Sequence, residues 1–113
     1  EVLLLDEPTK GLDGTFKKKL AGYLKEFVKE GLAIVMVSHD IAFCAEYADW
    51  CSLLFDGELT KMQVADEFFR QNCFYTTDIC RMFSKSLSDD NQNVPVRYAQ
   101  AKKILESGIA LEQ

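Results

Sequence analysis

The chain has 113 residues, with 18 acidic against 13 basic side chains and a formal net charge of -5. This length fits one ordinary domain, and a hydrophobic fraction of 48% is that of a globular protein rather than a disordered one. The negative charge argues against a nucleic-acid-binding domain, because such domains neutralise phosphates and are usually basic. The longest apolar run, Leu32 to Val37, is too short to cross a bilayer.

The cysteines and the histidine do not show metal-site spacing. Cys44, Cys51, Cys73 and Cys80 form no CxxC pair, and His39 is the single histidine of the sequence. Zinc sites usually place such ligands at short, regular separations, so no zinc site is predicted. The cysteines lie in apolar stretches and nothing resembles a secretion signal, so we expect small core side chains in a reducing, cytosolic compartment.

The first third of the chain has the pattern strand, helix, strand. Val2 to Leu5 is a continuous apolar run, typical of a strand buried on both faces, and 33–37 is a second such run. Between them, Asp13 is a predicted helix N-cap and Gly31 the residue just past the helix end. The apolar residues of this helix recur at helical spacing: Phe16, Leu20, Tyr23, Leu24, Phe27 and Val28.

A second helix and a hairpin are predicted next. Ile41, Cys44, Ala45 and Ala48 mark the apolar stripe of the helix. The segment 50–55 reads as a third strand, with Trp50 and Phe55 in the core, and Asp56-Gly57 is a tight-turn pair leading into 58–62. Alternating strands and helices indicate an α/β fold with a parallel sheet.

The remainder of the chain is predicted to be organised differently. The segments 64–69 and 77–83 indicate short helices, with Thr76 or Thr77 as a possible cap of the second. The polar segment 84–97 reads as a linker or loop, and 98–113 as a short helical tail. The predicted organisation is therefore one domain over 1–83, then the linker and the tail.

Two acids and the histidine are predicted to converge at one edge of the sheet. Asp6 and Glu7 close the first strand, and His39 follows the second. In parallel α/β sheets, chemistry gathers at the carboxyl ends of the strands. An aspartate there can hold Mg²⁺ through water, and the next carboxylate can polarise an attacking water. Taken alone, this acid pair could equally be a capping or solvated pair.

Two longer segments make a family resemblance specific. Val-Leu-Leu-Leu-Asp-Glu-Pro-Thr-Lys-Gly-Leu-Asp at 2–13, followed by Ile-Val-Met-Val-Ser-His-Asp at 34–40, closely resembles the nucleotide-binding subunits of ABC transporters. They correspond to that family's Walker B strand, D-loop and switch-histidine loop. The resemblance covers roughly 1–83, and the Pro-Thr-Lys-Gly-Leu-Asp variant is similar to energy-coupling-factor ATPases.

The resemblance implies a role for four residues. Asp6 corresponds to the aspartate that holds Mg²⁺, and Glu7 to the catalytic base. His39 corresponds to the residue that contacts the γ-phosphate of ATP. Asp13 corresponds to the D-loop aspartate, which in the family crosses a dimer interface, although it could equally act only as a helix cap. The lysines 17–19 read as a solvated helix face rather than a phosphate site.

The sequence contains only part of the motif set of this family. No glycine lies in a GxxxxGK[ST] phosphate-binding loop, and the Ser-Gly-Gly-Gln signature is absent. Because both precede the Walker B strand in the family, the resemblance implies the C-terminal portion of a P-loop NTPase (ABC ATPase) core. A C-terminal β-hairpin and short helices complete it. Alone, this portion is expected to be inactive.

For the complete protein, the resemblance implies hydrolysis of ATP with Mg²⁺, coupled to import of a vitamin or a metal ion. Its expected partners are a second ABC ATPase domain, in a head-to-tail dimer, and an integral membrane subunit. The expected location is the cytoplasmic face of the membrane, and no nucleic-acid partner is expected. Two alternatives stay open: a soluble ABC-type ATPase of translation or DNA repair, and a non-enzymatic interaction module.

Overall fold

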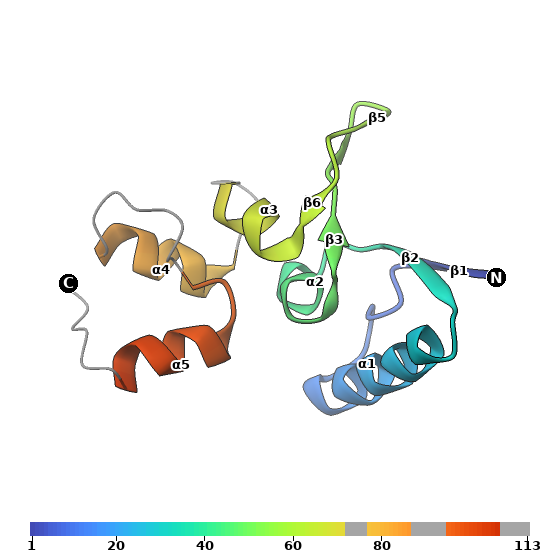
Figure 1. Ribbon diagram of the computed structural model, residues 1–113, viewed down its shortest axis with the longest axis horizontal. Coiled ribbons are helices and arrows are strands. Elements are labelled where there is room, and N and C mark those ends of the chain that lie inside the picture. The colour runs from blue at the N-terminus through green and yellow to red at the C-terminus, as the bar shows by residue number, and fades with distance from the viewer. Residues whose placement is uncertain (72–76, 87–94, 107–113) are drawn as a thin grey trace. The chain divides into compact units, whose positions relative to one another are not determined.

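The computed structural model describes residues 1–71, 77–86 and 95–106. The chain divides into two compact units, residues 1–43 and residues 44–113 (Figure 1). Within the described ranges, no helix is both long enough and apolar enough to cross a membrane.

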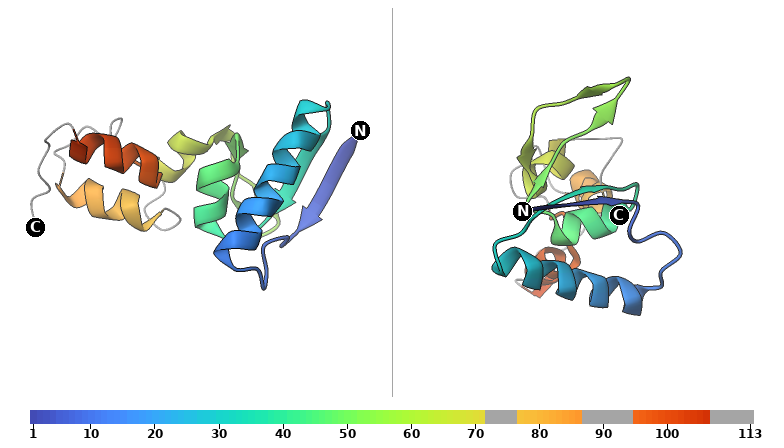
Figure 2. Two further views of the ribbon diagram at one scale, coloured as in Figure 1. Left: turned by 90° about the horizontal axis from the view of Figure 1, so that it is seen from below. Right: turned by 90° about the vertical axis from the view of Figure 1, so that its right-hand side faces the viewer.

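The first unit contains a parallel pair of strands joined by a helix. β1 (Val2–Asp6) and β2 (Ala33–Val37) pair in parallel with Leu4 opposite Val35, and α1 (Gly14–Lys29) connects them (Figure 2). The predicted order of strand, helix and strand is therefore confirmed. Parallel pairing brings the carboxyl ends of both strands to the same edge of the sheet.

Only one face of this strand pair is covered, which corrects the prediction of strands buried on both faces. Side chains alternate along each strand between half-buried and exposed, and Leu4 is 73% exposed. The half-buried side chains are Leu3, Leu5, Ile34 and Met36. The physical reason is that a single helix, α1, contacts this sheet within the unit and can cover one face only.

Both predicted ends of α1 are confirmed. The Asp13 side chain accepts a hydrogen bond from the backbone N–H of Phe16 at 2.9 Å, which satisfies one of the free N–H groups of the first turn. At the other end, Glu30 donates its backbone N–H to Glu26 at 3.0 Å, and Gly31 follows with φ of 94°. That left-handed conformation favours glycine and ends the helix.

The predicted third strand is present only in pieces. After α2 (Ile41–Tyr47), β3 (Trp50–Cys51) pairs antiparallel with β6 (Gln63–Val64), and β4 (Leu54–Phe55) is a separate strand. None of these described strands pairs with β1 or β2. The parallel sheet therefore has two strands in the described part of the chain, not the three that the pattern implied.

Hydroxyl groups explain why the strand is interrupted after Cys51. The Ser52 hydroxyl donates to the Thr60 carbonyl at 2.6 Å, and the backbone N–H of Leu53 donates to the Thr60 hydroxyl at 2.9 Å. The backbone N–H of Thr60 still donates to the Leu53 carbonyl at 2.9 Å, but the Thr60 carbonyl and the Leu53 N–H are bonded to hydroxyl groups instead of to each other, which interrupts the regular ladder between β3 and β4.

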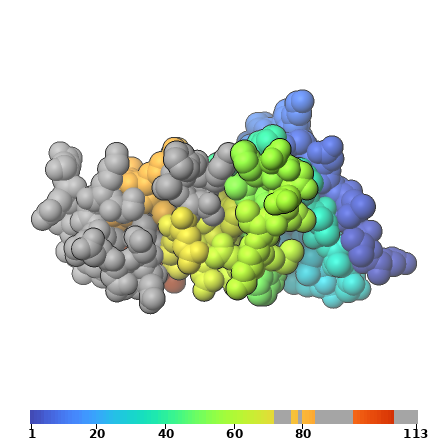
Figure 3. Space-filling model, turned by 90° about the horizontal axis from the view of Figure 1, so that it is seen from above, coloured from blue at the N-terminus to red at the C-terminus, as the bar shows by residue number. Residues whose placement is uncertain are grey.

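The predicted hairpin turn is confirmed. β4 pairs antiparallel with β5 (Glu58–Leu59), and the two residues between them have positive φ, 50° at Asp56 and 76° at Gly57. Such φ values at both central residues are those of a type I′ turn, which matches the twist of a hairpin. Trp50 and Phe55, however, are exposed and not in the core as predicted, and the hairpin lies at the surface in Figure 3.

Three short helices complete the second unit: α3 (Ala65–Gln71), α4 (Asp78–Ser86) and α5 (Tyr98–Glu106). Helices were predicted in all three places. Of the two candidate caps, Thr77 is the cap of α4, because its hydroxyl accepts from the backbone N–H of Cys80 at 3.2 Å. Thr76 lies outside the described residues.

These helices share a small core of their own. Its buried residues are Phe68, Phe69, Cys80, Phe83, Pro95, Val96 and Ala101. The rings of Phe68 and Phe69 meet edge to face with their centroids 5.0 Å apart. Asp66 on α3 bonds Arg97 at 3.3 Å and Gln100 on α5 at 3.1 Å. The α5 segment is therefore packed against the helices before it.

Part of the predicted organisation lies outside the described residues. The residues 87–94 of the predicted linker 84–97 and the end of the tail 98–113 are outside them, as is Cys73. Cys80 is buried, as predicted for a core cysteine, whereas Cys44 and Cys51 are half-buried. The domain boundaries at 83 and 97 stay a prediction.

Candidate functional site

The predicted acids and the histidine lie at the carboxyl ends of β1 and β2. Asp6 is the last residue of β1 and is in register with Val37, the last residue of β2. The backbone N–H of Glu7 donates to the Val37 carbonyl at 2.8 Å, which extends the pairing one residue beyond the strand. This additional hydrogen bond fixes the position of the Glu7 backbone relative to the loop that follows β2.

Glu7 turns out of the strand in a conformation that is uncommon for a residue with a side chain. Its φ is 47°, in the left-handed region. The turn continues with a hydrogen bond from the backbone N–H of Lys10 to the Glu7 carbonyl at 3.2 Å. The local backbone is thus bent at the residue that bears the second carboxylate.

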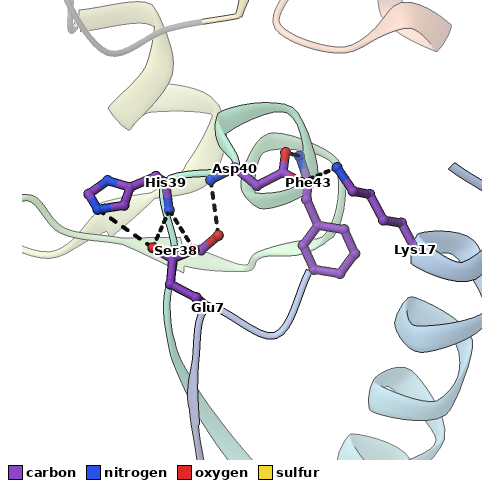
Figure 4. Close-up of polar contacts among 6 residues, drawn as sticks. All are labelled: Glu7, Lys17, Ser38, His39, Asp40 and Phe43. Atoms are coloured by element: carbon purple, nitrogen blue, oxygen red, sulfur yellow. Dashed lines mark hydrogen bonds and ion pairs between the residues drawn. The ribbon is translucent and has the colours of Figure 1, made fainter. Parts of the chain in front are cut away.

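The Glu7 carboxylate and His39 are in direct contact (Figure 4). The backbone N–H of His39 donates to both carboxylate oxygens of Glu7, at 3.0 Å and 3.3 Å. The imidazole Nε2 lies 3.6 Å from Oε1 of the same carboxylate, close enough for an ion pair when the ring is protonated. The His39 side chain is 98% exposed and that of Glu7 is 28% exposed. The backbone of the histidine loop, more than its ring, therefore orients the carboxylate.

Asp6 is placed differently from Glu7. It belongs to the exposed set of β1, and its carboxylate makes no hydrogen bond or ion pair within the described residues. A hard cation such as Mg²⁺ takes oxygen ligands and keeps several waters, and a single free carboxylate suits that mode of binding. The described residues contain no group of three metal-ligating side chains, so they form no closed metal site. Asp6 fits a magnesium ion that is held mostly by water and by other oxygen donors.

Asp13 is not part of the Glu7–His39 contact. Its carboxylate accepts from the backbone N–H of Phe16, so Asp13 acts as the N-cap of α1. The loop between Glu7 and Asp13 contains a turn in which the backbone N–H of Leu12 donates to the Thr9 carbonyl at 3.1 Å. A role for Asp13 at a dimer interface stays a prediction.

The sequence reasoning missed Asp40, whose carboxylate contacts both α1 and α2. Its Oδ2 lies 2.7 Å from Nζ of Lys17, and its Oδ1 accepts from the N–H of Phe43 at 3.1 Å (Figure 4). Its own backbone N–H donates to the Ser38 hydroxyl at 3.0 Å. Lys17 was predicted to be solvated and is instead half-buried in this pair.

The electrostatics of Asp40 follow from these contacts. Burial by itself raises the pKa of this carboxyl, but the bonds from Lys17, Phe43 and Thr9 and the charge of Lys17 outweigh it, so the pKa lies below its usual range. One signal in the sequence could have identified the cap, since an aspartate directly precedes the apolar stripe of α2. The pairing with Lys17, 23 residues away, had no such local signal.

Comparison with known proteins supports the resemblance. A protein assigned as an ABC transporter ATP-binding protein in Bacillus thuringiensis subsp. konkukian is 49% identical over 86 residues, which is 76% of this chain and 16% of that protein. The chain is a homologue of ABC transporter ATP-binding proteins. A hemin import ATP-binding protein of Gloeobacter violaceus is 44% identical over 64 residues, covering 57% of this chain and 23% of that protein.

The similarity to an energy-coupling-factor ATPase is also confirmed. An energy-coupling factor transporter ATP-binding protein of Methanocaldococcus jannaschii is 36% identical over 69 residues, which is 61% of this chain and 25% of that protein. The chain spans about a sixth of the length of the Bacillus ABC relative. No family model matches the chain. Homology to ABC ATP-binding proteins implies a P-loop NTPase fold, and the β1–α1–β2 unit is a parallel α/β portion of the kind this fold contains.

Proposed function

We propose that this chain supplies the catalytic base and the switch histidine of an ATP-hydrolysing subunit of an ABC transporter. The observation that carries the proposal is the contact between the Glu7 carboxylate and the loop of His39, with both carboxylate oxygens bonded to one backbone N–H. A base must be held at a fixed position relative to the water that it polarises, and this contact does so. The homology to ABC ATP-binding proteins supplies the reaction class.

In this proposal each residue has one task. Glu7 accepts a proton from water, and Asp6 holds Mg²⁺ through water. His39 donates a hydrogen bond from its exposed ring to the terminal phosphate. When bound, MgATP supplies the phosphoryl group that is transferred to water. Because the sequence has no GxxxxGK[ST] loop, the phosphates would be held by residues outside these 113.

The partners and location proposed for the complete protein follow from its relatives. One relative is named for hemin import and another for an energy-coupling factor transporter. We propose that the complete protein lies at the cytoplasmic face of the membrane, against an integral membrane subunit that imports a vitamin or a metal ion. Asp13, at the start of α1, would contact a second ABC ATPase domain in a head-to-tail dimer.

The decisive experiment is Glu7→Gln in a longer protein that includes the phosphate-binding loop. The amide keeps the size of the side chain and an oxygen for the N–H of His39, but it cannot take a proton. The rate of ATP hydrolysis is expected to fall by about 10²- to 10⁴-fold, with ATP binding retained. Glu58→Gln, in the exposed hairpin, is the matched control and should hydrolyse ATP at the parent rate.

Hydrolysis by Glu7→Gln at the parent rate would refute the assignment of the base. The 113-residue chain serves as a second comparison and is expected to show no saturable MgATP binding by calorimetry. Tight binding of MgATP to the 113-residue chain would show that these residues hold the phosphates themselves, contrary to the division of tasks proposed above.

A further inference from the structure

The loop that carries His39 is anchored at one residue, Asp40. Its carboxylate contacts Lys17 on α1 at 2.7 Å. It also caps α2 through the N–H of Phe43 at 3.1 Å. Asp40 therefore ties the start of α2 to α1.

The side chain of His39 has few contacts to hold it in place. With 98% of its side chain exposed, the ring gains almost no packing energy from its surroundings. The His39 backbone is held near the start of α2: its carbonyl accepts from the N–H of Ile41 at 3.0 Å, and the next residue is the anchored Asp40. Asp40 also contacts the residue on the other side of His39, because the backbone N–H of Asp40 donates to the Ser38 hydroxyl at 3.0 Å.

The anchor and the base are consequently joined through two consecutive residues. Lys17 pairs with Asp40, Asp40 directly follows His39 in the chain, and the His39 N–H donates to the Glu7 carboxylate at 3.0 Å and 3.3 Å. The Lys17–Asp40 pair is partly shielded, with side chains 35% and 18% exposed, so solvent screens it less than a fully exposed pair.

We infer that Lys17 and Asp40 act as positioning residues for catalysis, holding the His39 backbone so that Glu7 points at the attacking water. The inference rests on the proposed function, because it assigns a cause to the placement of the proposed base. Neither residue would touch the nucleotide. Loss of the pair should therefore lower kcat for ATP hydrolysis and leave the KM for ATP nearly unchanged.

The test uses Lys17→Met in the longer protein that contains the phosphate-binding loop. Methionine keeps much of the apolar stem and removes the charge. We expect kcat to fall about tenfold with KM within about twofold, because a small displacement of a catalytic group costs that much or more. Lys17→Arg, which can still reach the carboxylate, is expected to restore most of kcat.

Lys18→Met is the matched control. Lys18 is the next residue of α1, is exposed, and forms no ion pair within the described part of the chain. It should hydrolyse ATP at the parent rate. A merely structural role of Lys17 would lower the fraction of folded protein and leave kcat per folded molecule unchanged, and that result would overturn the inference.

A second variant keeps the inference testable if Lys17→Met does not fold. Asp40→Asn retains an oxygen for the N–H of Phe43 and loses the charge that pairs with Lys17. It is expected to show the same loss of kcat, and a parent kcat would overturn the inference. Glu7→Gln in the same assay separates the two hypotheses. An active Glu7→Gln refutes the proposed function, whereas an inactive Glu7→Gln beside a fully active Lys17→Met refutes only the positioning role.

Discussion

Replacement of Asp40 by alanine is expected to destabilise the 113-residue chain by about 1.5–2 kcal/mol at pH 7. Loss of the cap on α2, where Oδ1 accepts from Phe43 at 3.1 Å, contributes about 1 kcal/mol. Loss of the bond from Lys17 contributes about 0.5–1 kcal/mol, because the 2.7 Å contact is charge-assisted but Lys17 is 35% exposed and partly screened by solvent. Urea unfolding followed by circular dichroism measures the difference.

The same prediction has a pH dependence with a definite sign. The contacts of Asp40 lower its pKa in the folded state, whereas the unfolded chain has a value of about 3.9. The folded state therefore binds this proton less readily, so the stabilisation is present above about pH 4 and is lost as the pH falls through the lowered folded pKa. The difference between the parent and Asp40→Ala should be constant from pH 5 to pH 7 and shrink toward the cap contribution or less at about pH 3.

Two results would refute this reasoning. A difference below about 0.5 kcal/mol at pH 7 would mean that the contacts of Asp40 add nothing net to stability. A difference that stays the same from pH 7 to pH 3 would mean that the carboxylate charge is not the source of the stabilisation. Lys18→Ala, measured in parallel, reports the cost of an uninvolved residue on the same helix.

Two further predictions each compare a pair of alanine variants by urea unfolding of the chain: two glycines in different backbone conformations, and two adjacent residues on opposite faces of β2. Gly57→Ala should cost about 1 kcal/mol because φ is 76° there, whereas Gly22→Ala, within α1 and with nothing within 4 Å of an added Cβ, should stabilise by about 0.5–1 kcal/mol; equal effects would contradict the assigned turn. Ile34→Ala, half-buried on the covered face of β2, should cost about 1–2 kcal/mol more than Val35→Ala on the exposed face; equal losses would mean that both faces are covered.

The parts of the fold that could be predicted from the sequence are those set by local patterns. The two apolar runs, the cap at Asp13 and the Asp56-Gly57 turn depend on residues within a few positions of one another, and each is present in the structure. The run from Trp50 to Phe55 has the composition of one strand as well. What divides it is Thr60, several residues away, whose hydroxyl and carbonyl bond the segment between β3 and β4.

The site shows the same limit. Order along the chain and the rule for parallel sheets were enough to predict that Glu7 and His39 share one edge of the sheet, and the structure brings them together. The closest contact uses the backbone N–H of His39, and it lies between the left-handed turn at Glu7 and the cap at Asp40. Neither can be read from the identity of the histidine.

This distinction separates two tasks that one residue performs. The backbone of His39 orients Glu7 at 3.0 Å and 3.3 Å, while its ring, almost fully exposed and 3.6 Å from the same carboxylate, stays available to a ligand. A side chain that held the base by itself could not at the same time turn toward a phosphate without releasing that base. Because the backbone N–H bonds the Glu7 carboxylate, the ring can move while this proposed base stays in place. The anchoring of that backbone inferred for Lys17 and Asp40 would let the ring be exposed while the Glu7 carboxylate keeps its position.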